Sequence, residues 1–356
     1  MREGSEIRTK KNIPGAILTV LAAYAAISAL IHPARMAEAV SAALSLSVRA
    51  VVPSLFAFVA AMKILSPALV SLFSKMKRTR RFFGVGAGGM AMMFSGLMSG
   101  FPTAAVVYSE LGKIGAIDEA EGESLMPFCS GASAAFLIGA VGEKMFGDAA
   151  LGVRLLICQT AAALILILIT KKRRRPSRLA SAEKARITPA HAAGAIADAG
   201  KTMLGIASFI AFFSVVSDAL AADLNLDGYA DAIVRSTLEI SGGAAALSRT
   251  DGGRYLLGFA AGFSGVSVYM QSCFAAQGAA MKKYLSGKVI MSAVTGALFA
   301  LTEIFRAAPA FFEIFGSRAT EAKNTAHFIF ILALISAICG AVGVFISRKA
   351  TKAKNK

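Results

Sequence analysis

Serine and glycine recur in short motifs inside otherwise apolar segments of the sequence. FSGLMS, Phe94–Ser99, has a counterpart in FSGVS, Phe263–Ser267, and SGASAA, Ser130–Ala135, has one in SGGAAA, Ser241–Ala246. Glycine lets a helix break, and serine hydroxyls satisfy the backbone groups that a break frees. Half-helix N-termini at a break point N–H groups and a positive dipole end at an anion. The motifs therefore predict broken helices that hold a small anionic solute.

The expected solute site draws on both halves of the chain. Small residues at such spacings also allow membrane helices to pack closely, and the sequence leaves this second interpretation open. In the first half we expect the site to contain Ser95, Gly96, Ser99, Gly100, Pro102, Ser130, Gly131 and Ser133. In the second half we expect Glu239, Ser241, Gly242, Ser264, Gly265, Ser267 and Gln271.

A few ionisable or polar residues lie inside the apolar segments. Glu239 precedes the Ser241 motif, and Arg235 lies four residues earlier, on the same helical face. A charge at mid-membrane is costly, so Glu239 is a functional candidate, the alternative being that it only pairs with Arg235. Lys63 and Arg154 are expected to extend toward the membrane interface. Gln271 suits either a ligand contact or a hydrogen bond between helices.

Catalytic and metal-binding patterns are not found in the sequence. It contains no GxSxG, HExxH or Walker A motif, and its three His are far apart. The four Cys stand singly in apolar segments, which indicates buried thiols and neither a disulfide framework nor a zinc site. We therefore expect no enzyme, no cofactor and no metal, with an intramembrane enzyme as a minor alternative.

Composition indicates an integral membrane protein. The 356 residues are 56% hydrophobic and only 17% charged, whereas soluble domains carry about 25% charged residues. The net charge of +17 resides in short segments between apolar runs, where it marks the cytoplasmic side, and no nucleic-acid-binding motif accompanies it. We expect the bilayer and a small anionic solute as partners, no nucleic acid, and leave a homo-oligomer open.

Two uncharged runs are too long for one crossing and too short for two. Phe82–Ser109 has 28 residues and Tyr255–Met281 has 27, whereas one crossing takes about 20. The basic clusters Lys75–Arg81 and Lys171–Arg175 belong on one side, yet three apolar runs separate them. A re-entrant Phe82–Ser109 resolves this conflict. In the second half, the acidic loop around Asp223 and Asp227 belongs outside and Lys282, Lys283 and Lys288 belong inside, yet two apolar runs separate them. One of these two runs is therefore also expected not to cross the membrane.

The expected fold is all-α: about eight transmembrane helices plus two re-entrant or broken hairpins in inverted repeats. The motif pairs occur in opposite order in the halves, and the charge rule directs Val51–Phe73 inward and Thr202–Leu220 outward. Residues 1–50 should form a membrane helix and an interfacial helix. The remaining units are a first repeat at 51–170, a basic cytoplasmic linker at 171–200, a second repeat at 201–305, and a last membrane helix with a basic cytoplasmic tail at 306–356.

Three segments resemble a known family. The stretch from Ser99 to Gly142, SGFPTAAVVYSELGKIGAIDEAEGESLMPFCSGASAAFLIGAVG, is similar to the central signature of YlbJ-type sporulation membrane proteins, which belong to the nucleoside-recognition or Gate-domain group. LEISGG, Leu238–Gly243, and GFSGVSVYMQ, Gly262–Gln271, resemble second-half signatures of that family. Departures occur where the family usually has Tyr at Phe101, Asn near Cys129–Gly131, and Pro at Ala134 or Ala135.

The resemblance implies a permease that moves dipicolinic acid across the outer forespore membrane during spore formation. A nucleoside or another small polar solute is an alternative ligand. A membrane assembly or gating subunit without transport activity is an alternative of another class. The sequence does not choose a coupling ion, a direction of transport or an oligomeric state.

Overall fold

The described residues fold into helices alone. The computed structural model describes residues 13–177, 187–277 and 281–315, and within these ranges it contains fourteen α-helices, four short π or 3-10 segments and no strand. The expectation of an all-α chain is confirmed for this part of the sequence. The expected last membrane helix, 326–347, lies outside it, as do residues 178–186 of the basic linker predicted at 171–200. Residues 189–200 of that expected linker belong to the helix Pro189–Asp223.

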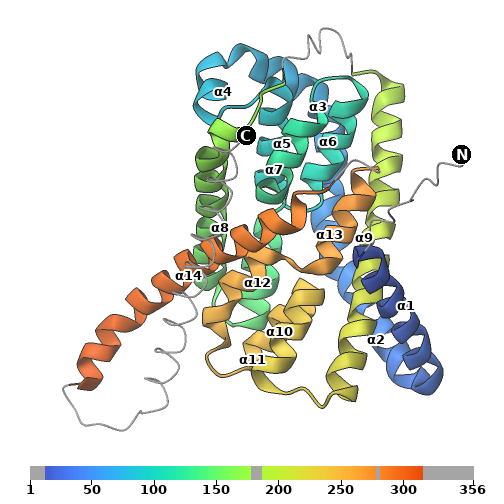
Figure 1. The fold of residues 1–356 in the computed structure, drawn as a ribbon, viewed down its shortest axis with the longest axis vertical. Coiled ribbons are helices and arrows are strands. Elements are labelled where there is room, and N and C mark those ends of the chain that lie inside the picture. Colours follow the sequence, from blue (N-terminus) through green and yellow to red (C-terminus); the bar gives the residue numbers. More distant parts are fainter. Residues whose placement is uncertain (1–12, 178–186, 278–280, 316–356) are drawn as a thin grey trace, which may run out of the picture.

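Among the described residues, four helices are long and apolar enough to cross a membrane, or up to six if each of two bent pairs counts as one span. This is compatible with an integral membrane protein, whereas the expected number of about eight spans is not confirmed. The first bent pair is α1 (Ile13–Ile31) with α2 (Pro33–Leu46), which turns by 117° at His32. Both helices pack against the lower part of α9 (Figure 1).

The first part of the chain begins with the long helix α3 (Val52–Lys75), which follows the π segment Ser47–Val51. After it come a hairpin, a broken segment and a second long helix. These elements are α4 (Lys77–Phe83), α5 (Ala87–Ser99), α6 (Thr103–Lys113), α7 (Glu119–Cys129), η2 (Ala135–Met145), α8 (Ala149–Ile169) and η3 (Thr170–Arg173).

The second part has the same order of elements. Its long helix α9 (Pro189–Asp223) runs along the opposite side of the molecule from α8 (Figure 1). A hairpin, a broken segment and a final long helix follow. They are α10 (Gly228–Leu238), α11 (Ile240–Arg249), η4 (Gly253–Leu256), α12 (Leu257–Phe263), α13 (Gly265–Ala275) and α14 (Tyr284–Phe315).

The helix starts follow from local side chains. Asp118 accepts a hydrogen bond from the Glu121 N–H at the start of α7, and Asp148 accepts one from the Leu151 N–H at the start of α8. Thr188 caps α9 in the same way, with Pro189 as the first helical residue. Such caps satisfy N–H groups that have no partner within the helix.

Both parts contain a packed hairpin followed by a broken segment, but the elements differ from the sequence-based prediction. In the first part α5 packs against α6 as predicted for Phe82–Ser109. In the second part the hairpin is α10 with α11, within 228–249, and Tyr255–Met281 is instead the broken segment α12–α13. The predicted break in this run is confirmed at Ser264, whereas the hairpin of this part lies elsewhere, because hairpin tips and helix breaks share the same small, polar composition.

The motif pairs are corrected accordingly. Ser95 and Gly96 lie inside the continuous helix α5, whereas their presumed partner Ser264 separates two helices. By position in the fold, the hairpin turn at 100–102 corresponds to the turn at Glu239, and the break at 130–134 corresponds to Ser264. The hairpin turn therefore precedes the break in both parts, and the motifs that are similar in sequence lie at different positions in the fold.

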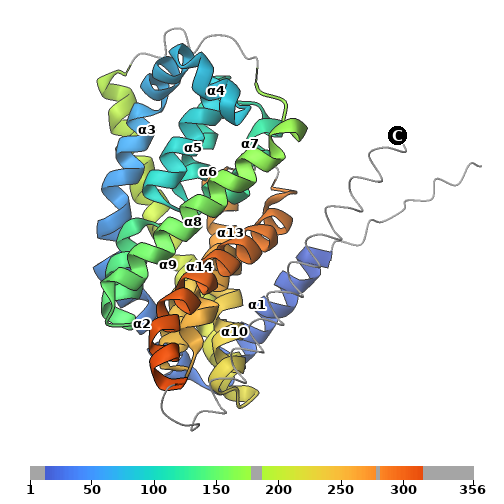
Figure 2. The ribbon, with the colours of Figure 1, turned by 90° about the vertical axis from the view of Figure 1, so that its left-hand side faces the viewer.

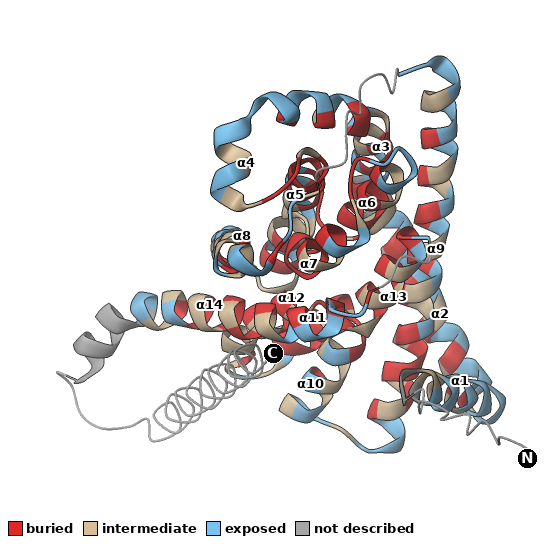
Figure 3. Ribbon diagram, turned by 45° about the horizontal axis from the view of Figure 1, so that its top comes forward, coloured by how far each residue is buried: buried red, intermediate tan, exposed pale blue. Residues whose placement is uncertain are grey.

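The two basic clusters lie together at one end of the molecule, called here the basic end. The Arg174 guanidinium donates to the Phe83 carbonyl over 3.1 Å. The Lys171 side chain lies so close to Gly84 that a Cβ on this glycine would be 2.5 Å from the Lys171 Cγ. Both clusters therefore lie at one end of the described molecule, and their placement on the cytoplasmic side stays a prediction. Buried residues concentrate in α5, α6 and α7, which neighbouring helices surround (Figure 3).

Candidate functional site

The break in the first part, residues 130–134 between α7 and η2, is closed by hydrogen bonds within the protein. Gln159 of α8 accepts from the Ala132 N–H and donates to the Ala132 carbonyl, each over 3.0 Å. The tip of the α5–α6 hairpin adds a bond of 2.7 Å from the Phe101 N–H to the Gly131 carbonyl. Gln159 thus replaces the helical partners that Ala132 lacks.

Close approach of backbones explains the glycines at this break. Gly100 has φ +77°, and a Cβ there would lie 2.5 Å from the Ser133 nitrogen. A Cβ on Gly131 would lie 2.6 Å from the Gln159 side-chain nitrogen, and one on Gly96 would lie 2.3 Å from the Cys129 carbonyl oxygen. The packing interpretation, left open by the sequence, accounts for these three residues.

The break in the second part lies at Ser264, between α12 and α13. Ser264 has φ +69°, a left-handed conformation that is rare for residues other than glycine, asparagine and aspartate. Its hydroxyl donates to the Ala261 carbonyl over 2.8 Å. The tip of the α10–α11 hairpin lies against it, because a Cβ on Gly265 would be 3.1 Å from the Leu238 carbonyl oxygen. Each hairpin tip therefore packs on the break of its own part.

Glu239 forms the tip of the second hairpin. It is 2% exposed, its backbone is extended, and its carboxylate accepts from the Gly242 N–H over 2.8 Å at the start of α11. The alternative that Glu239 only pairs with Arg235 is wrong, because Arg235 binds Asp231 over 2.6 Å and also Asp218. The extended residue takes the Glu239 side chain off the helical face on which Arg235 lies.

One cavity of about 410 Å³ lies between the two parts. It brings together four of the predicted site residues: Ser133, Glu239, Ser241 and Gln271. The remaining lining is largely apolar and includes Phe101, Phe136, Ile206, Ile210 and Ile240, with the exposed cations Arg49 and Lys144. An apolar cavity with a few converging polar groups is the usual form of a small-molecule site.

The polar groups in this cavity are incompletely bonded. The Gln271 amide nitrogen donates to the Ser267 hydroxyl over 3.1 Å, while its oxygen is buried without a hydrogen-bond partner among the described residues. The Ser133 hydroxyl accepts from the Phe136 N–H over 3.2 Å. The Glu239 carboxylate has acceptor capacity for a ligand, and the Gln271 oxygen gains the same capacity once a movement of the protein uncovers it.

The other predicted residues lie outside this cavity. Ser95 and Ser99 are buried in α5 with hydroxyls that have no partner in the part of the chain described. Gly96 and Gly131 line a separate void of about 10 Å³, roughly the volume needed for one water. Ser130 and Ser264 lie at the two breaks, and the rest hold helix ends or turns: Gly100, Pro102, Gly242, Gly265 and Ser267.

Lys288 is the main residue that the sequence analysis missed. It is 1% exposed, and its Nζ donates to the Ser130 carbonyl over 2.8 Å and to the Ser264 hydroxyl over 2.9 Å. The sequence analysis grouped it with Lys282 and Lys283 as a flanking charge. Its position one turn inside the apolar run that begins at Tyr284 was the available signal.

Lys63 does not extend to an interface, as the sequence suggested. It is 4% exposed and binds Glu110 over 2.8 Å and Asp198 over 3.3 Å. These contacts connect α3 and α6 of the first part with α9 of the second. Lys63 is therefore the buried member of a partly exposed ion-pair network that crosses between the parts.

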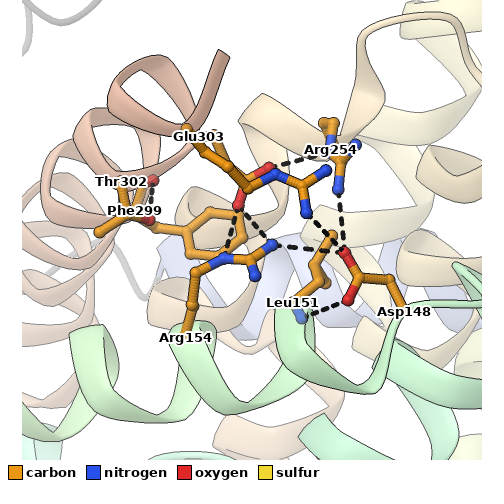
Figure 4. Close-up of polar contacts among 8 residues, drawn as sticks. Asp148, Leu151, Arg154, Arg254, Phe299, Thr302 and Glu303 are labelled. Carbon is orange, nitrogen blue, oxygen red and sulfur yellow. Dashed lines mark hydrogen bonds and ion pairs between the residues drawn. The ribbon is translucent and has the colours of Figure 1, made fainter. Parts of the chain in front are cut away.

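Arg154 belongs to a second network, at the end of α8 remote from the basic end (Figure 4). Glu303 of α14 binds Arg154 and Arg254, each over 2.9 Å. Asp148 contacts Arg154 over 3.4 Å and Arg306 over 3.3 Å. The pKa of Asp148 is lowered chiefly because the Leu151 N–H donates to its carboxylate; the nearby guanidinium groups act in the same direction.

The described residues provide no metal site. They contain no cluster of three or more His, Cys, Asp and Glu side chains that could hold an ion. Cys129, Cys158 and Cys273 are free thiols, and Cys339 lies outside the described residues.

Comparison with known proteins gives no match: no family model, curated protein or solved structure is significantly similar to this chain.

Proposed function

We propose that this protein is a membrane permease for a small anionic solute and that the 410 Å³ cavity is its solute site. The observation that carries the proposal is the composition of the lining. Phe101 and Glu239 come from the two hairpin tips, and Ser133 and Gln271 come from the two broken segments. In transporters built from repeated halves, discontinuous helices at corresponding places form the substrate site.

The repeats are inverted in this proposal. The long helix α3 ends at the basic end, whereas α9 starts near it and runs away (Figure 2). Two parts with the same element order but opposite starting directions are expected for inverted-topology repeats. The positive-inside rule would place the basic end in the cytoplasm, and the run 326–347 would add a crossing toward the expected total of about eight.

Charge on the cavity lining supports an anionic solute. Arg49 and Lys144 contribute two positive charges and Glu239 one negative charge, which gives a net charge of +1. The rings of Phe101 and Phe136 offer an aromatic solute apolar contact. A small aromatic carboxylate suits this lining, and the YlbJ-type resemblance suggests dipicolinate, moved across the outer forespore membrane.

A nucleoside or similar neutral polar solute is the second candidate, because one observation favours it. The Glu239 carboxylate and the unpartnered Gln271 oxygen are acceptors, which suit hydroxyl and amino groups better than carboxylates. Under this alternative Arg49 and Lys144 would contribute little to the binding free energy of the solute.

Alternating access would involve the two ion-pair networks that cross between the parts. The Lys63 network joins α3 and α6 to α9, and the Glu303 network joins α8 to α14 and η4 at the other end. Relative movement of the repeats would open one network while the other stayed closed.

Uptake into liposomes tests the proposal. The purified protein is reconstituted, and entry of radiolabelled dipicolinate is compared with entry of radiolabelled uridine. Arg49→Gln with Lys144→Gln should lower dipicolinate uptake several-fold, since each exposed charge contributes roughly 0.2–1 kcal/mol. Arg249→Gln, an exposed cation away from the cavity, is the matched control. Uptake of neither solute would contradict the permease and favour a non-transport assembly subunit.

A further inference from the structure

The Lys288 side chain connects the two helix breaks. It extends from α14, and its two acceptors belong to different parts: Ser130 follows α7 in the first part, and Ser264 follows α12 in the second. The ammonium group is therefore the point at which both broken segments meet.

The acceptors of this ammonium are neutral. The Ser130 carbonyl lies at the C-terminus of α7, where backbone dipoles present partial negative charge to a cation, and the Ser264 hydroxyl lies at the junction between the C-terminus of α12 and the N-terminus of α13. Within the described residues no carboxylate forms an ion pair with the Lys288 Nζ within 4.0 Å, whereas the other buried lysine, Lys63, binds two carboxylates. In broken-helix transporters, unwound carbonyls and C-terminal helix ends coordinate the coupling cation. Lys288 fills such a position with its own amine.

The surroundings contain few titratable groups, and the charged ones are engaged elsewhere. On α14 itself, Tyr284 lies one turn before Lys288 and accepts from Ser272 over 3.3 Å. Glu303 lies 15 residues later on the same helix, about 22 Å away, with Arg154 and Arg254 bound to it. The helix α12 carries no titratable side chain, and Glu123 of α7 pairs with Lys283. The other titratable groups on elements packed against α14 or Tyr284 are Glu119, Glu121, Cys129, Cys158, Tyr255, Tyr269 and Cys273.

We propose that the Lys288 ammonium is a built-in coupling cation and that a proton, not a sodium ion, drives this permease. The inference rests on the proposed function and names its coupling ion. Protonated Lys288 holds the breaks together through Ser130 and Ser264. When movement of the repeats admits water, one N–H bond breaks, the proton passes to water, and the electron pair stays on Nζ. Loss of the charge weakens both contacts and releases the two broken segments from each other.

Two transport assays on reconstituted protein test this inference, with dipicolinate and uridine as probes. Counterflow exchange reports solute movement without an ion gradient, and accumulation under a pH gradient reports coupling. For one proton per solute, one pH unit supports up to about tenfold accumulation, since a tenfold ratio corresponds to about 1.4 kcal/mol. Wild-type protein should accumulate solute under the pH gradient and not under a sodium gradient.

Lys288→Gln and Lys288→Arg distinguish coupling from a structural role. Glutamine removes the charge, and arginine keeps a charge that it does not release. Lys288→Gln should retain counterflow above that of protein-free liposomes but lose pH-driven accumulation. Lys288→Arg should lose pH-driven accumulation as well, and its counterflow should fall below that of Lys288→Gln because its permanent charge keeps the two breaks together. A merely structural Lys288 would instead be rescued by arginine in both assays.

The outcomes separate the two proposals. Wild-type counterflow with pH-driven accumulation that persists in Lys288→Gln would overturn the role of Lys288, as would accumulation driven by sodium. Absence of wild-type counterflow for both probes would instead contradict the permease itself. If both variants aggregate on size-exclusion chromatography, the wild-type protein tests the coupling ion directly. Accumulation driven by a pH gradient and not by a sodium gradient would support the proposal, and accumulation driven by sodium would overturn it.

Discussion

The two helix breaks have the same surroundings but differ in how their polar groups are used. At the first break, Gln159 and Phe101 form hydrogen bonds with the buried backbone groups of Gly131 and Ala132, which have no helical partners. At the second, the Glu239 carboxylate and the Gln271 oxygen line the cavity with acceptor capacity that the protein does not fill. Under the proposed function, the first break is a scaffold and the second would provide most of the polar contacts to the solute.

The largest expected effect follows from breaking the scaffold. Gln159→Leu leaves the buried N–H and carbonyl of Ala132 without partners, at about 1–3 kcal/mol for each group. Thermal unfolding in detergent should show a clear loss of stability, relative to Gln277→Leu as an exposed control. Equal stability of the two variants would show that the first break does not depend on Gln159.

A change at the second break should affect transport more than stability. Glu239→Gln removes a negative charge from the cavity. It also weakens the hydrogen bond from the Gly242 N–H, and hydrogen bonds to charged groups contribute about 1.5–3 kcal/mol to stability. If the solute is an anion, its KM should fall; a neutral hydrogen-bond donor such as uridine should show a KM at least tenfold higher. Glu38→Gln, an exposed glutamate on α2, is the matched control. Unchanged KM values for both solutes would remove Glu239 from the site.

Gln271→Leu provides a direct counterpart to Gln159→Leu, because the same residue types are exchanged at the other break. Its amide oxygen has no described partner to lose, so the free energy of unfolding should change by less than about 1.5 kcal/mol. Solute affinity should fall about tenfold if one hydrogen bond to the ligand is lost. A stability loss as large as that of Gln159→Leu would erase the proposed difference between the breaks.

The smallest expected effect concerns Asp148, which touches neither break. Because its pKa is lowered in the folded protein, its stabilising contribution is complete above the unfolded value of about 3.9 and is lost as pH falls below that value. The Tm difference between wild type and Asp148→Asn should therefore shrink between pH 5 and pH 3, with KM unaffected at neutral pH. A difference that is constant with pH would contradict this role for Asp148.

Part of this structure could be predicted from sequence. The length of Phe82–Ser109 and the charge count indicated a hairpin, and α5 and α6 form one. The motif containing Ser264 indicated a break, which lies at that residue. The pairing of motifs failed because local composition does not distinguish a hairpin tip, which reverses the chain, from a break, which does not.

Long-range contacts explain what the sequence could not provide. Gln159 and Ala132 are 27 residues apart, and Lys288 and Ser130 are 158 apart, so only the folded chain brings these groups together. Glu239 shows a different cause of error. Its relation to Arg235 was inferred from helical spacing, and one extended residue at the hairpin tip invalidates that spacing.

Solute protection of a cysteine in the cavity tests the central claim most directly. Ala135 lines the cavity with an exposed side chain, and Ala149 is exposed at the start of α8, outside it. Ala135→Cys and Ala149→Cys are made in a background where Cys129, Cys158, Cys273 and Cys339 are replaced. If the cavity holds the solute, dipicolinate or uridine should slow maleimide labelling of the cysteine at 135 several-fold and leave that at 149 unchanged. Equal labelling rates at 135 with and without either solute would contradict the account.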